Sequence, residues 1–421
     1  MPGPRNNSRN RRSMQRGKPR PPLPPEEPFA GVIERLAWGG NGLCRMPDGR
    51  IVLLEAPLAL FPGEEVEALV RFRKRHGNGY VTAWRRHDKR RGRQGCTVAQ
   101  VCGGCNLWEA GEAYAELKQL MVEDLFNRNL KNAPTWDFKP AAPDARRSRI
   151  QLHWNGRRLG YHRSRERAIV AVSSCPMADP LVSAAVPRLA EALREHALPV
   201  EPDRWELATG TPAKHVIATG ENQPGMAWRL SNDTWEPCQE PLTHECGGIS
   251  LRQSPGAFFQ ACPAWAWEAF GKVFDDWGLE GRTLFDLYGG GGFFSRMLKD
   301  RFSEFVLVEG NTVAVRDAKA NLCGMDVAFH PQEVSNWLPK QLGKAGDVVI
   351  LDPPRSGMQE RVVNKLKGAG ASHLVLVGCD GAMFCRDVSR FAPEWQLEKL
   401  SVIDLFPNTA HVECVGLLTR R

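Results

Sequence analysis

The sequence lacks any long apolar run. None of its segments approaches the roughly 20 consecutive apolar residues that span a membrane, and its N-terminus has no apolar signal-peptide core. We therefore expect a cytoplasmic protein, with no membrane partner and with thiols kept reduced. Twelve cysteines in such a chain indicate metal binding or catalysis rather than disulfides. A monomer is the default expectation.

Acidic residues are absent before Glu26, and residues 1–28 are rich in proline, asparagine and arginine. This composition predicts a disordered basic tail, which is either a solvated extension or a nonspecific RNA tether. The net charge of +8 permits a polyanionic partner without requiring one. A chain of 421 residues with ordinary composition predicts about two or three domains.

Short strands separated by glycine turns fill residues 29–86. Turn signals such as Gly39–Gly42 and Pro47–Gly49 separate about five strands, which predicts a small β-barrel of OB type. One side of the barrel would be basic through Arg71, Arg73, Lys74, Arg75, Arg85 and Arg86. Such barrels often bind single-stranded nucleic acid, although a structural barrel would show the same pattern.

Three cysteines follow with C-x5-C-x2-C spacing: Cys96, Cys102 and Cys105. Two glycines between the last pair let the backbone wrap tightly around a metal or cluster. No fourth ligand is nearby, and the best candidate is Cys175, because a Cys-Pro pair often ends an iron–sulfur ligand set. Zinc would accept the same four thiolates. We predict this site in a central α+β domain, residues 87–247, with a helix over residues 107–130.

Residues 144–172 are dense in arginine, with interleaved apolar residues such as Ile150 and Leu152. The pattern predicts a β-hairpin around Asn155-Gly156. Because the arginines lie beside the predicted metal site, contact with RNA phosphates is a better interpretation than a solvated face.

A strand, a glycine run and a helix open the last domain, residues 248–421. The strand ends at Tyr288, the turn is Gly289–Gly292, and a second strand about twenty residues later ends at Glu309. This order predicts a nucleoside cofactor, because glycines allow close approach and a carboxylate can bind both ribose hydroxyls. No G-x-G-x-x-G is nearby, which favours S-adenosylmethionine over a nicotinamide. Alternating strands and helices predict a doubly wound sheet.

A thiol and two carboxylates are predicted to meet at strand ends of this sheet. Cys379 follows the apolar run 374–377, Asp352 ends another such run, and Glu413 lies beside a third. A lone cysteine is more often a packed core residue. Together with the two carboxylates, however, it forms a plausible catalytic constellation.

These motifs resemble those of the RNA uracil-5-methyltransferases, in the 23S rRNA branch that carries a TRAM domain and a [4Fe-4S] cluster. The resemblance begins near Phe29 and covers nearly the whole chain. It rests on the barrel, the cysteine spacing and the segments 254–260, 286–292, 308–310, 351–357, 378–380 and 406–413. It implies an α/β fold, in which a TRAM-like barrel and a cluster-bearing domain precede a Rossmann-like methyltransferase domain. The implied substrate is RNA, with 23S rRNA favoured over tRNA.

The resemblance also implies a role for each site residue. Cys379 would be the nucleophile and Glu413 the general base. S-adenosylmethionine would be surrounded by Gln260, Tyr288, Phe293, Glu309, Glu333 and Asp352, and the [4Fe-4S] cluster would be held by Cys96, Cys102, Cys105 and Cys175.

Two positions depart from the family pattern. Phe293 stands where asparagine is usual, so only its backbone could contact the cofactor. The segment Gly378-Cys379-Asp380-Gly381 replaces the usual Ser-Cys-Asn-Pro, and we expect this change to loosen the nucleophile turn.

The implied chemistry explains why these groups are needed. Uracil C5 is a poor nucleophile, but a thiolate that adds to C6 creates an enolate whose C5 can attack a methyl sulfonium. The C5 proton must then leave, which suits Glu413, and the target base must flip out of its stack. Alternatives are tRNA as the substrate, a cytosine C5 target, or a noncatalytic RNA-binding iron–sulfur protein with a degenerate methyltransferase domain. Amine methylation is disfavoured, because Arg355 follows the Pro-Pro pair where an aromatic residue is typical.

Overall fold

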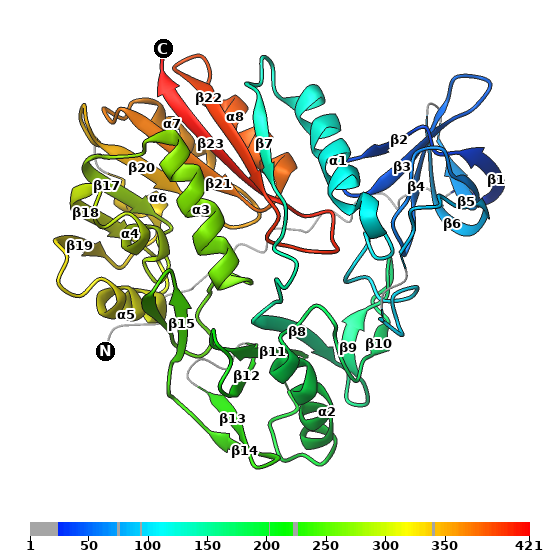
Figure 1. The fold of residues 1–421 in the computed structure, drawn as a ribbon, viewed down its shortest axis with the longest axis horizontal. Coiled ribbons are helices and arrows are strands. Elements are labelled where there is room, and N and C mark those ends of the chain that lie inside the picture. Colours follow the sequence, from blue (N-terminus) through cyan, green and yellow to red (C-terminus); the bar gives the residue numbers. More distant parts are fainter. Residues whose placement is uncertain (1–23, 74–75, 93–94, 202, 222–225, 339–341) are drawn as a thin grey trace, which may run out of the picture.

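The computed structural model describes residues 24–73, 76–92, 95–201, 203–221, 226–338 and 342–421. The predicted basic tail falls largely outside these residues, as do Lys74 and Arg75 of the predicted basic side of the barrel. The described residues form four sheets (Figure 1). None of the described helices combines the length and the apolar character that crossing a membrane requires.

The N-terminal sheet is an OB-type barrel with the strand order β1-β5-β6-β4-β3-β2. Its strands are β1 (Glu27–Val32), β2 (Arg35–Ala37), β3 (Asn41–Arg45), β4 (Ile51–Glu55), β5 (Glu65–Phe72) and β6 (His76–Arg86). The two end strands, β1 and β2, are joined by only two residues, Ile33 and Glu34. The backbone N–H of Ile33 donates to the carbonyl of Glu64 at 2.9 Å, and that of Glu34 donates to the carbonyl of Leu43 at 2.8 Å. These bonds bring the ends of the sheet together around a core that includes Val52, Leu54 and Val66.

The middle of the chain forms a seven-stranded antiparallel sheet covered by α2 (Pro180–Arg194). Its strands are β8 (Arg149–Trp154), β9 (Leu159–His162), β10 (Ile169–Ala171), β11 (Arg204–Thr209), β12 (Val216–Gly220), β13 (Ala227–Ser231) and β14 (Thr234–Pro237). The predicted hairpin around Asn155-Gly156 is confirmed, because β8 pairs with β9. Asp179 caps α2 by accepting the N–H of Leu181. A two-stranded hairpin, β15 (Leu242–Cys246) and β16 (Ile249–Gln253), leads to the last domain.

The C-terminal sheet is doubly wound, as predicted, with the order β19-β18-β17-β20-β21-β23-β22-β7. Strands β17 to β21 run parallel, and β23 is antiparallel to both of its neighbours. The strands are β17 (Gly281–Leu287), β18 (Phe302–Val308), β19 (Val327–His330), β20 (Val348–Leu351), β21 (His373–Gly378), β22 (Trp395–Ile403) and β23 (Glu413–Arg420). The helices are α3 (Pro263–Trp277), α4 (Phe293–Met297), α5 (Thr312–Asn321), α6 (Val334–Trp337), α7 (Glu360–Lys367) and α8 (Gly381–Arg390).

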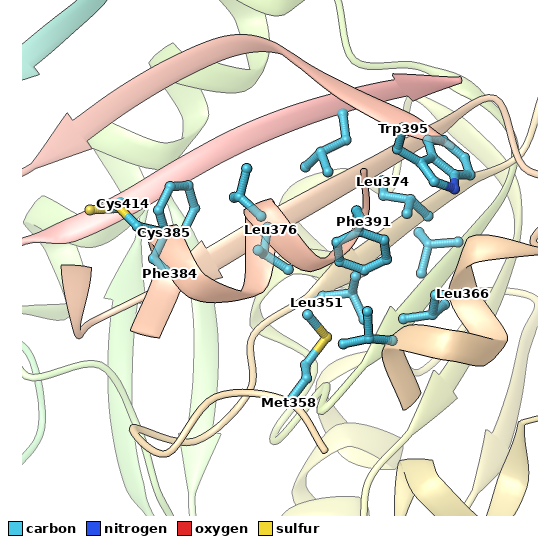
Figure 2. Packing of buried hydrophobic residues seen from close by; sticks show 14 of the residues in the cluster. Leu351, Met358, Leu366, Leu374, Leu376, Phe384, Cys385, Phe391, Trp395 and Cys414 are labelled. Atoms are coloured by element: carbon cyan, nitrogen blue, oxygen red, sulfur yellow. The ribbon is translucent and has the colours of Figure 1, made fainter. Parts of the chain in front are cut away.

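Alternate residues of the central strands fill two separate cores. Leu374 and Leu376 of β21 pack in one core with Phe384 and Phe391, from α8 and its C-cap (Figure 2). Val375 and Val377 belong to the opposite core, which contains the aromatic rings of α3. The apolar run before Cys379 is therefore a strand buried on both faces, which places the end of that strand reliably.

Helix α1 (Tyr114–Asn129) and strand β7 (Trp136–Lys139) precede the antiparallel sheet in sequence but pack with the C-terminal one. β7 pairs in parallel with β22 at the sheet edge, and Leu125 and Phe126 of α1 join the α8 core. α1 begins at Tyr114 after a 3-10 turn, Gly111–Ala113, rather than at the predicted residue 107. The domain boundaries stay a prediction. The packing shows that α1 and β7, which fall in the predicted central domain, lie against the last domain.

Candidate active site

Asp352, Cys379 and Glu413 lie at one edge of the C-terminal sheet. Asp352 directly follows β20 and Cys379 directly follows β21, while Glu413 is the first residue of the antiparallel β23. The strand register places Gly378 opposite Cys414 and Leu351 opposite Leu376. The structure thus brings the predicted thiol and both carboxylates to the edge where open α/β sheets bind ligands.

The Cys379 thiol is half-buried and mainly protonated at neutral pH. Burial, and then the Glu413 carboxylate, raise the pKa of Cys379 to about 12, whereas the Arg355 guanidinium lowers it by its charge and by a hydrogen bond. The thiol lines a small hollow, and Arg355, Pro354 and Asp380 are among the other lining residues. Arg355 is therefore the group placed to favour the thiolate form.

Arg355 is held in place by α8. The N–H of Met358 donates to the buried carboxylate of Asp387 at 2.7 Å, and the Arg386 guanidinium donates to the carbonyl of Ser356 at 3.0 Å. These bonds fix the Pro-Pro loop beside the end of β21. In the sequence alone, Arg355 is evidence only against amine methylation. Its contact with Cys379 arises because β20 and β21 are neighbouring parallel strands, so the loops that follow them lie side by side. That strand order is the signal that could have revealed the contact.

Several carboxylates share this edge and raise one another's pKa. Burial, and then Asp286 and Glu309, raise the pKa of Asp352 to about 7. The pKa of Glu413 lies well above its ordinary value, because the side chain is buried and Asp352 is near, although Arg355 opposes the shift. Asp286 is fully buried with a pKa near 6, and one of its oxygens has no hydrogen-bond partner among the described residues. Such a set is electrostatically suited to a cation.

The glycine turn lies beside these carboxylates. The Glu309 carboxylate accepts the N–H of Gly290 at 3.0 Å and that of Asn311 at 2.6 Å. Gly290 adopts a left-handed φ of 52°, which glycine tolerates without strain. Glu333 lies over Gly310, where an added Cβ would come within 2.5 Å of its carboxylate oxygen. Burial is the main cause that raises the pKa of Tyr288 to about 12, and the Glu333 charge adds to this shift. The structure therefore brings Tyr288, Glu309, Glu333 and Asp352 together.

Phe293 is the first residue of α4, directly after the turn, and Gln260 follows Phe259, whose ring packs against that of Phe293. The Phe293 ring is buried edge-on against Phe259 and Trp267, with ring centroids 6.0 and 5.4 Å apart. Only its backbone remains available to a ligand, as the sequence indicated. Gln260 follows Phe259, and its loop is tied to α5 because the N–H and hydroxyl of Ser254 both donate to Asp317 at 2.7 Å.

The nucleophile turn is capped rather than loosened. The Asp380 carboxylate accepts the N–H groups of Ala382 and Met383 at 3.0 Å each, so it serves as the N-cap of α8. A Cβ on Gly381 would come within 2.6 Å of Leu125 and 2.9 Å of Trp38. The departure from the family pattern thus produces a close-packed turn, contrary to the expectation of a looser one.

The four predicted ligand cysteines gather in one place. Cys96, Cys105 and Cys175 pack around a small apolar cluster that contains Trp108 and Met177. The pKa of Cys102 is raised by burial and by Cys96 and Cys175, and Gly104 donates its N–H to the Cys102 sulfur at 3.4 Å. Among the described residues, no group of three or more His, Cys, Asp or Glu side chains has the arrangement of a metal-ion site. The cysteines lie near one another in the described part of the chain without the arrangement of a metal site, and thiolate is the ligand type that iron–sulfur clusters use.

Comparisons with known proteins give one matching family and several relatives. Residues 344–421 match the family described as tRNA (Uracil-5-)-methyltransferase. A Pseudomonas aeruginosa protein named 23S rRNA (uracil(1939)-C(5))-methyltransferase RlmD is 30% identical, covering 92% of this chain and 93% of its own. An RNA methyltransferase of Corynebacterium efficiens, itself uncharacterised, is 28% identical over 96% of this chain and 97% of its own.

A solved structure shares the fold. The crystal structure of a Pyrococcus abyssi tRNA (uracil-54, C5)-methyltransferase in complex with S-adenosyl-L-homocysteine aligns with a TM-score of 0.67. The alignment covers 93% of this chain and 100% of that one, at 23% identity.

Proposed function

This chain belongs to the RNA uracil-5-methyltransferase family, and from that premise we propose that it methylates uridine C5 in 23S rRNA through Cys379 and Glu413. The observation that supports the roles of these two residues is their meeting, with Asp352 and Arg355, at one sheet edge. The choice of 23S rRNA follows the name of the 30% identical relative. A tRNA substrate is the competing outcome, because the matching family description names tRNA.

S-adenosylmethionine supplies an electrophilic methyl group on a sulfonium. Its site is proposed to include Gln260, Tyr288, Glu309, Glu333 and Asp352, with the backbone of Phe293. The glycine turn permits close approach, and the surrounding carboxylates complement a positive charge.

The chain's own groups perform the bond changes. Arg355 stabilises the Cys379 thiolate, which forms a bond to C6 of the flipped uracil and turns the ring into an enolate. C5 would attack the methyl group, whose bond to the sulfonium sulfur breaks with the electron pair left on sulfur, so that S-adenosylhomocysteine is the leaving group; Glu413 then removes the C5 proton. The electron pair of that C–H bond restores the C5–C6 double bond and expels the thiolate. Glu413 removes the proton in its ionised form. Because its pKa lies well above the ordinary carboxyl range, this form is a stronger base than an exposed carboxylate but is less populated at neutral pH.

We further propose that Cys96, Cys102, Cys105 and Cys175 hold a [4Fe-4S] cluster. The proposal is supported by the C-x5-C-x2-C spacing and by the packing of Cys96, Cys105 and Cys175 against one apolar cluster. The hairpin beside them presents Arg157, Arg158, Arg163 and Arg167 to solvent, which suits contact with RNA phosphates. Together with the barrel, this surface is proposed to carry the RNA.

The test is methyl transfer from labelled S-adenosylmethionine by anaerobically purified protein, to unmodified 23S rRNA and separately to tRNA. Label recovered as 5-methyluridine from rRNA is the expected result. Label from tRNA alone would overturn the proposed substrate, and label in 5-methylcytidine would overturn the target base. Absence of label from both RNAs, with the cluster intact, would favour the noncatalytic alternative.

Two variants test the residue roles. Cys379→Ala should abolish methylation while RNA binding and cofactor binding persist, and turnover near the wild-type rate would contradict the nucleophile assignment. Glu413→Gln should accumulate a covalent RNA–protein adduct on denaturing gels, because methyl transfer proceeds but proton removal does not.

A further inference from the structure

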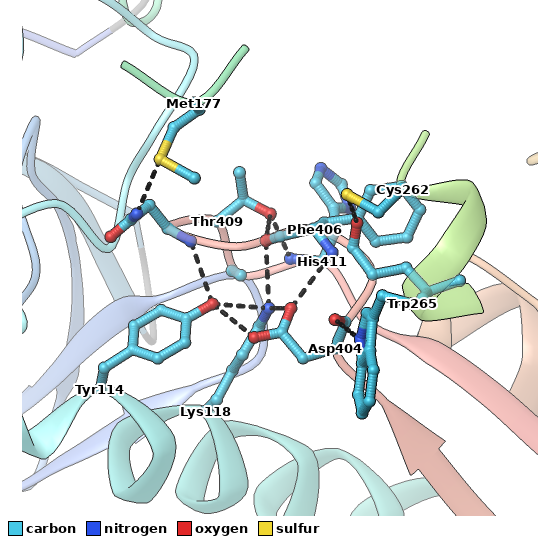
Figure 3. A network of polar contacts seen from close by, with 12 residues as sticks. Tyr114, Lys118, Met177, Cys262, Trp265, Asp404, Phe406, Thr409 and His411 are labelled. Atoms are coloured by element: carbon cyan, nitrogen blue, oxygen red, sulfur yellow. Dashed lines mark hydrogen bonds and ion pairs between the residues drawn. The ribbon is translucent and has the colours of Figure 1, made fainter. Parts of the chain in front are cut away.

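The loop of residues 404–412 carries Glu413 into the site, and one anchor of this loop is a buried ion pair. Lys118 of α1 and Asp404 are both fully buried and form an ion pair. The Lys118 ammonium also donates to the hydroxyl of Tyr114 at 3.0 Å and to the carbonyl of Phe406 at 3.1 Å (Figure 3). The Tyr114 hydroxyl in turn donates to Asp404 at 2.7 Å and accepts the N–H of Asn408 at 3.0 Å.

The cysteine segments provide a second anchor. Asn106 directly follows Cys105, and its side-chain oxygen accepts the N–H of Ala410 at 2.9 Å. The next residue, Leu107, donates its N–H to the carbonyl of Asn408 at 3.0 Å. Met177, two positions after Cys175, lies with its sulfur 3.0 Å from the Asn408 amide (Figure 3). Residues that follow two of the proposed cluster ligands thus bond to the loop that ends in Glu413, through the side chains of Asn106 and Met177 and the backbone of Leu107.

Asn106 also joins the barrel to this loop. Its amide donates to the carbonyl of Gly39 at 2.7 Å, at the turn between β2 and β3. An added Cβ on the neighbouring Gly40 would lie 3.0 Å from the Asn106 amide and 3.7 Å from Ala410. One side chain therefore links the barrel turn, the cysteine segment and the Glu413 loop.

The nucleophile turn shares part of this framework, because Gly381 packs against Leu125 of α1 and against Trp38, the neighbour of Gly39. It also has an anchor of its own that does not involve Asn106. The turn that carries Cys379 is fixed by the Asp380 cap and by packing of Gly381 against Leu125 and Trp38. Because Asn106 bonds directly to Ala410 of the Glu413 loop, whereas the Asp380 cap holds the nucleophile turn without it, a change at Asn106 should shift Glu413 more than the thiol.

We propose that Asn106 is a positioning residue for Glu413, through which the four-cysteine site governs removal of the C5 proton. This inference rests on the proposed roles of Cys379 and Glu413. A general base acts only within hydrogen-bond reach of the proton it removes, and small misplacements of catalytic groups have large effects on rate. Loss of the Asn106–Ala410 bond should therefore slow release of methylated RNA more than methyl transfer.

The experiment follows both steps in single-turnover reactions of the full-length, cluster-containing protein with its RNA. Asn106→Ala should transfer methyl at nearly the wild-type rate, release product about tenfold more slowly, and accumulate the covalent adduct. Asn106→Asp keeps an oxygen that can accept from Ala410, so it should restore most of the release rate. Visible cluster absorbance should be unchanged in both variants, whereas Cys105→Ser should lose the absorbance and accumulate adduct.

Asn129→Ala is the matched control. The Asn129 amide donates to the carbonyl of Leu125 within α1, at 2.8 Å, so this variant also removes a side-chain bond to backbone, but not one to the Glu413 loop. It should release product at the wild-type rate.

Glu413→Gln separates failure of this inference from failure of the proposed function. If Glu413→Gln traps the adduct and Asn106→Ala releases product normally, the inference is overturned and the proposed function stands. If Glu413→Gln traps no adduct, the assignment of the base fails and the inference fails with it. An Asn106→Ala protein that slows both steps equally, or that loses visible absorbance, has a general structural defect, which also overturns the inference.

Discussion

Replacing Arg355 by methionine should make the Cys379 thiol less reactive. Burial and the carboxylates of Glu413 and Asp352 raise the pKa of this thiol, and among the described groups that act on it only Arg355 lowers it. Methionine preserves much of the aliphatic stem of Arg355 and removes the charge and the hydrogen-bond donors. The variant thus removes the stabilisation of the thiolate without leaving a large void.

The expected size of the effect follows from the contact. A hydrogen bond to a charged group contributes roughly 1.5–3 kcal/mol when it is shielded from water. Arg355 is exposed and Cys379 only half-buried, so solvent screening reduces the contribution to about 1.4 kcal/mol, a factor of about ten in thiolate population. With a pKa near 12, the thiolate fraction rises with pH across the whole neutral range. The ratio between wild type and variant should therefore be the same at pH 7 and at pH 8.

The assay is the alkylation rate of Cys379 by iodoacetamide, measured on the Cys379 peptide by mass spectrometry between pH 6.5 and 8.5. Arg355→Met should react about tenfold more slowly at each pH, and Arg355→Lys should lie between it and wild type, because the charge remains but the planar fork is lost. Alkylation of Arg355→Met at the wild-type rate would refute the argument. A raised KM for RNA with unchanged alkylation would instead assign Arg355 to substrate binding.

Three further predictions follow from buried groups. Lys118→Met should lower the free energy of unfolding by about 3–5 kcal/mol in urea titrations, because Asp404 is left buried and unpaired; a loss below 1 kcal/mol would show that the pair contributes little. Cys175→Ser should remove the visible cluster absorbance, and an unchanged spectrum would mean that another residue is the fourth ligand. The preference for S-adenosylmethionine over S-adenosylhomocysteine, measured by calorimetry, should rise with pH through about 7 as Asp352 ionises, and Asp352→Asn should remove that rise; a pH-independent preference in the wild type would contradict it.

Local patterns in the sequence were sufficient to predict the strand ends and the glycine turn. The apolar run before Cys379 and the spacing from Tyr288 to Glu309 both depend on short segments with strong periodicity, and the structure shows the expected strands at both places. The barrel and the hairpin were predictable for the same reason. In both places glycine turns separate short strands that pair as hairpins, such as β3 with β4 and β8 with β9.

Contacts between distant segments were beyond such patterns. β7 is only four residues long and pairs with β22, from the other end of the chain. The predicted helix start at residue 107 was wrong, because Leu107 donates its N–H to Asn408 rather than continuing a helix. Asn106 has no distinctive local signal, and its importance lies in a partner about three hundred residues away. In each case tertiary bonding overrides the preference of the local sequence.

Carboxylates are concentrated around Cys379, and their burial is costly for the fold. Their charges also affect when the thiolate forms relative to cofactor binding. Glu413 and Asp352 raise the pKa of the thiol, so an empty cofactor site disfavours the thiolate. A sulfonium placed among these carboxylates would offset their charge and lower the pKa of Cys379 by the same electrostatic coupling. With Cys379 as the proposed nucleophile, we expect the thiol to become reactive chiefly when the methyl donor is present, which would limit RNA adducts that cannot be resolved. The alkylation assay can measure this coupling: S-adenosylmethionine should accelerate reaction of Cys379 more than S-adenosylhomocysteine, which has no positive sulfur, and equal effects of the two ligands would contradict it.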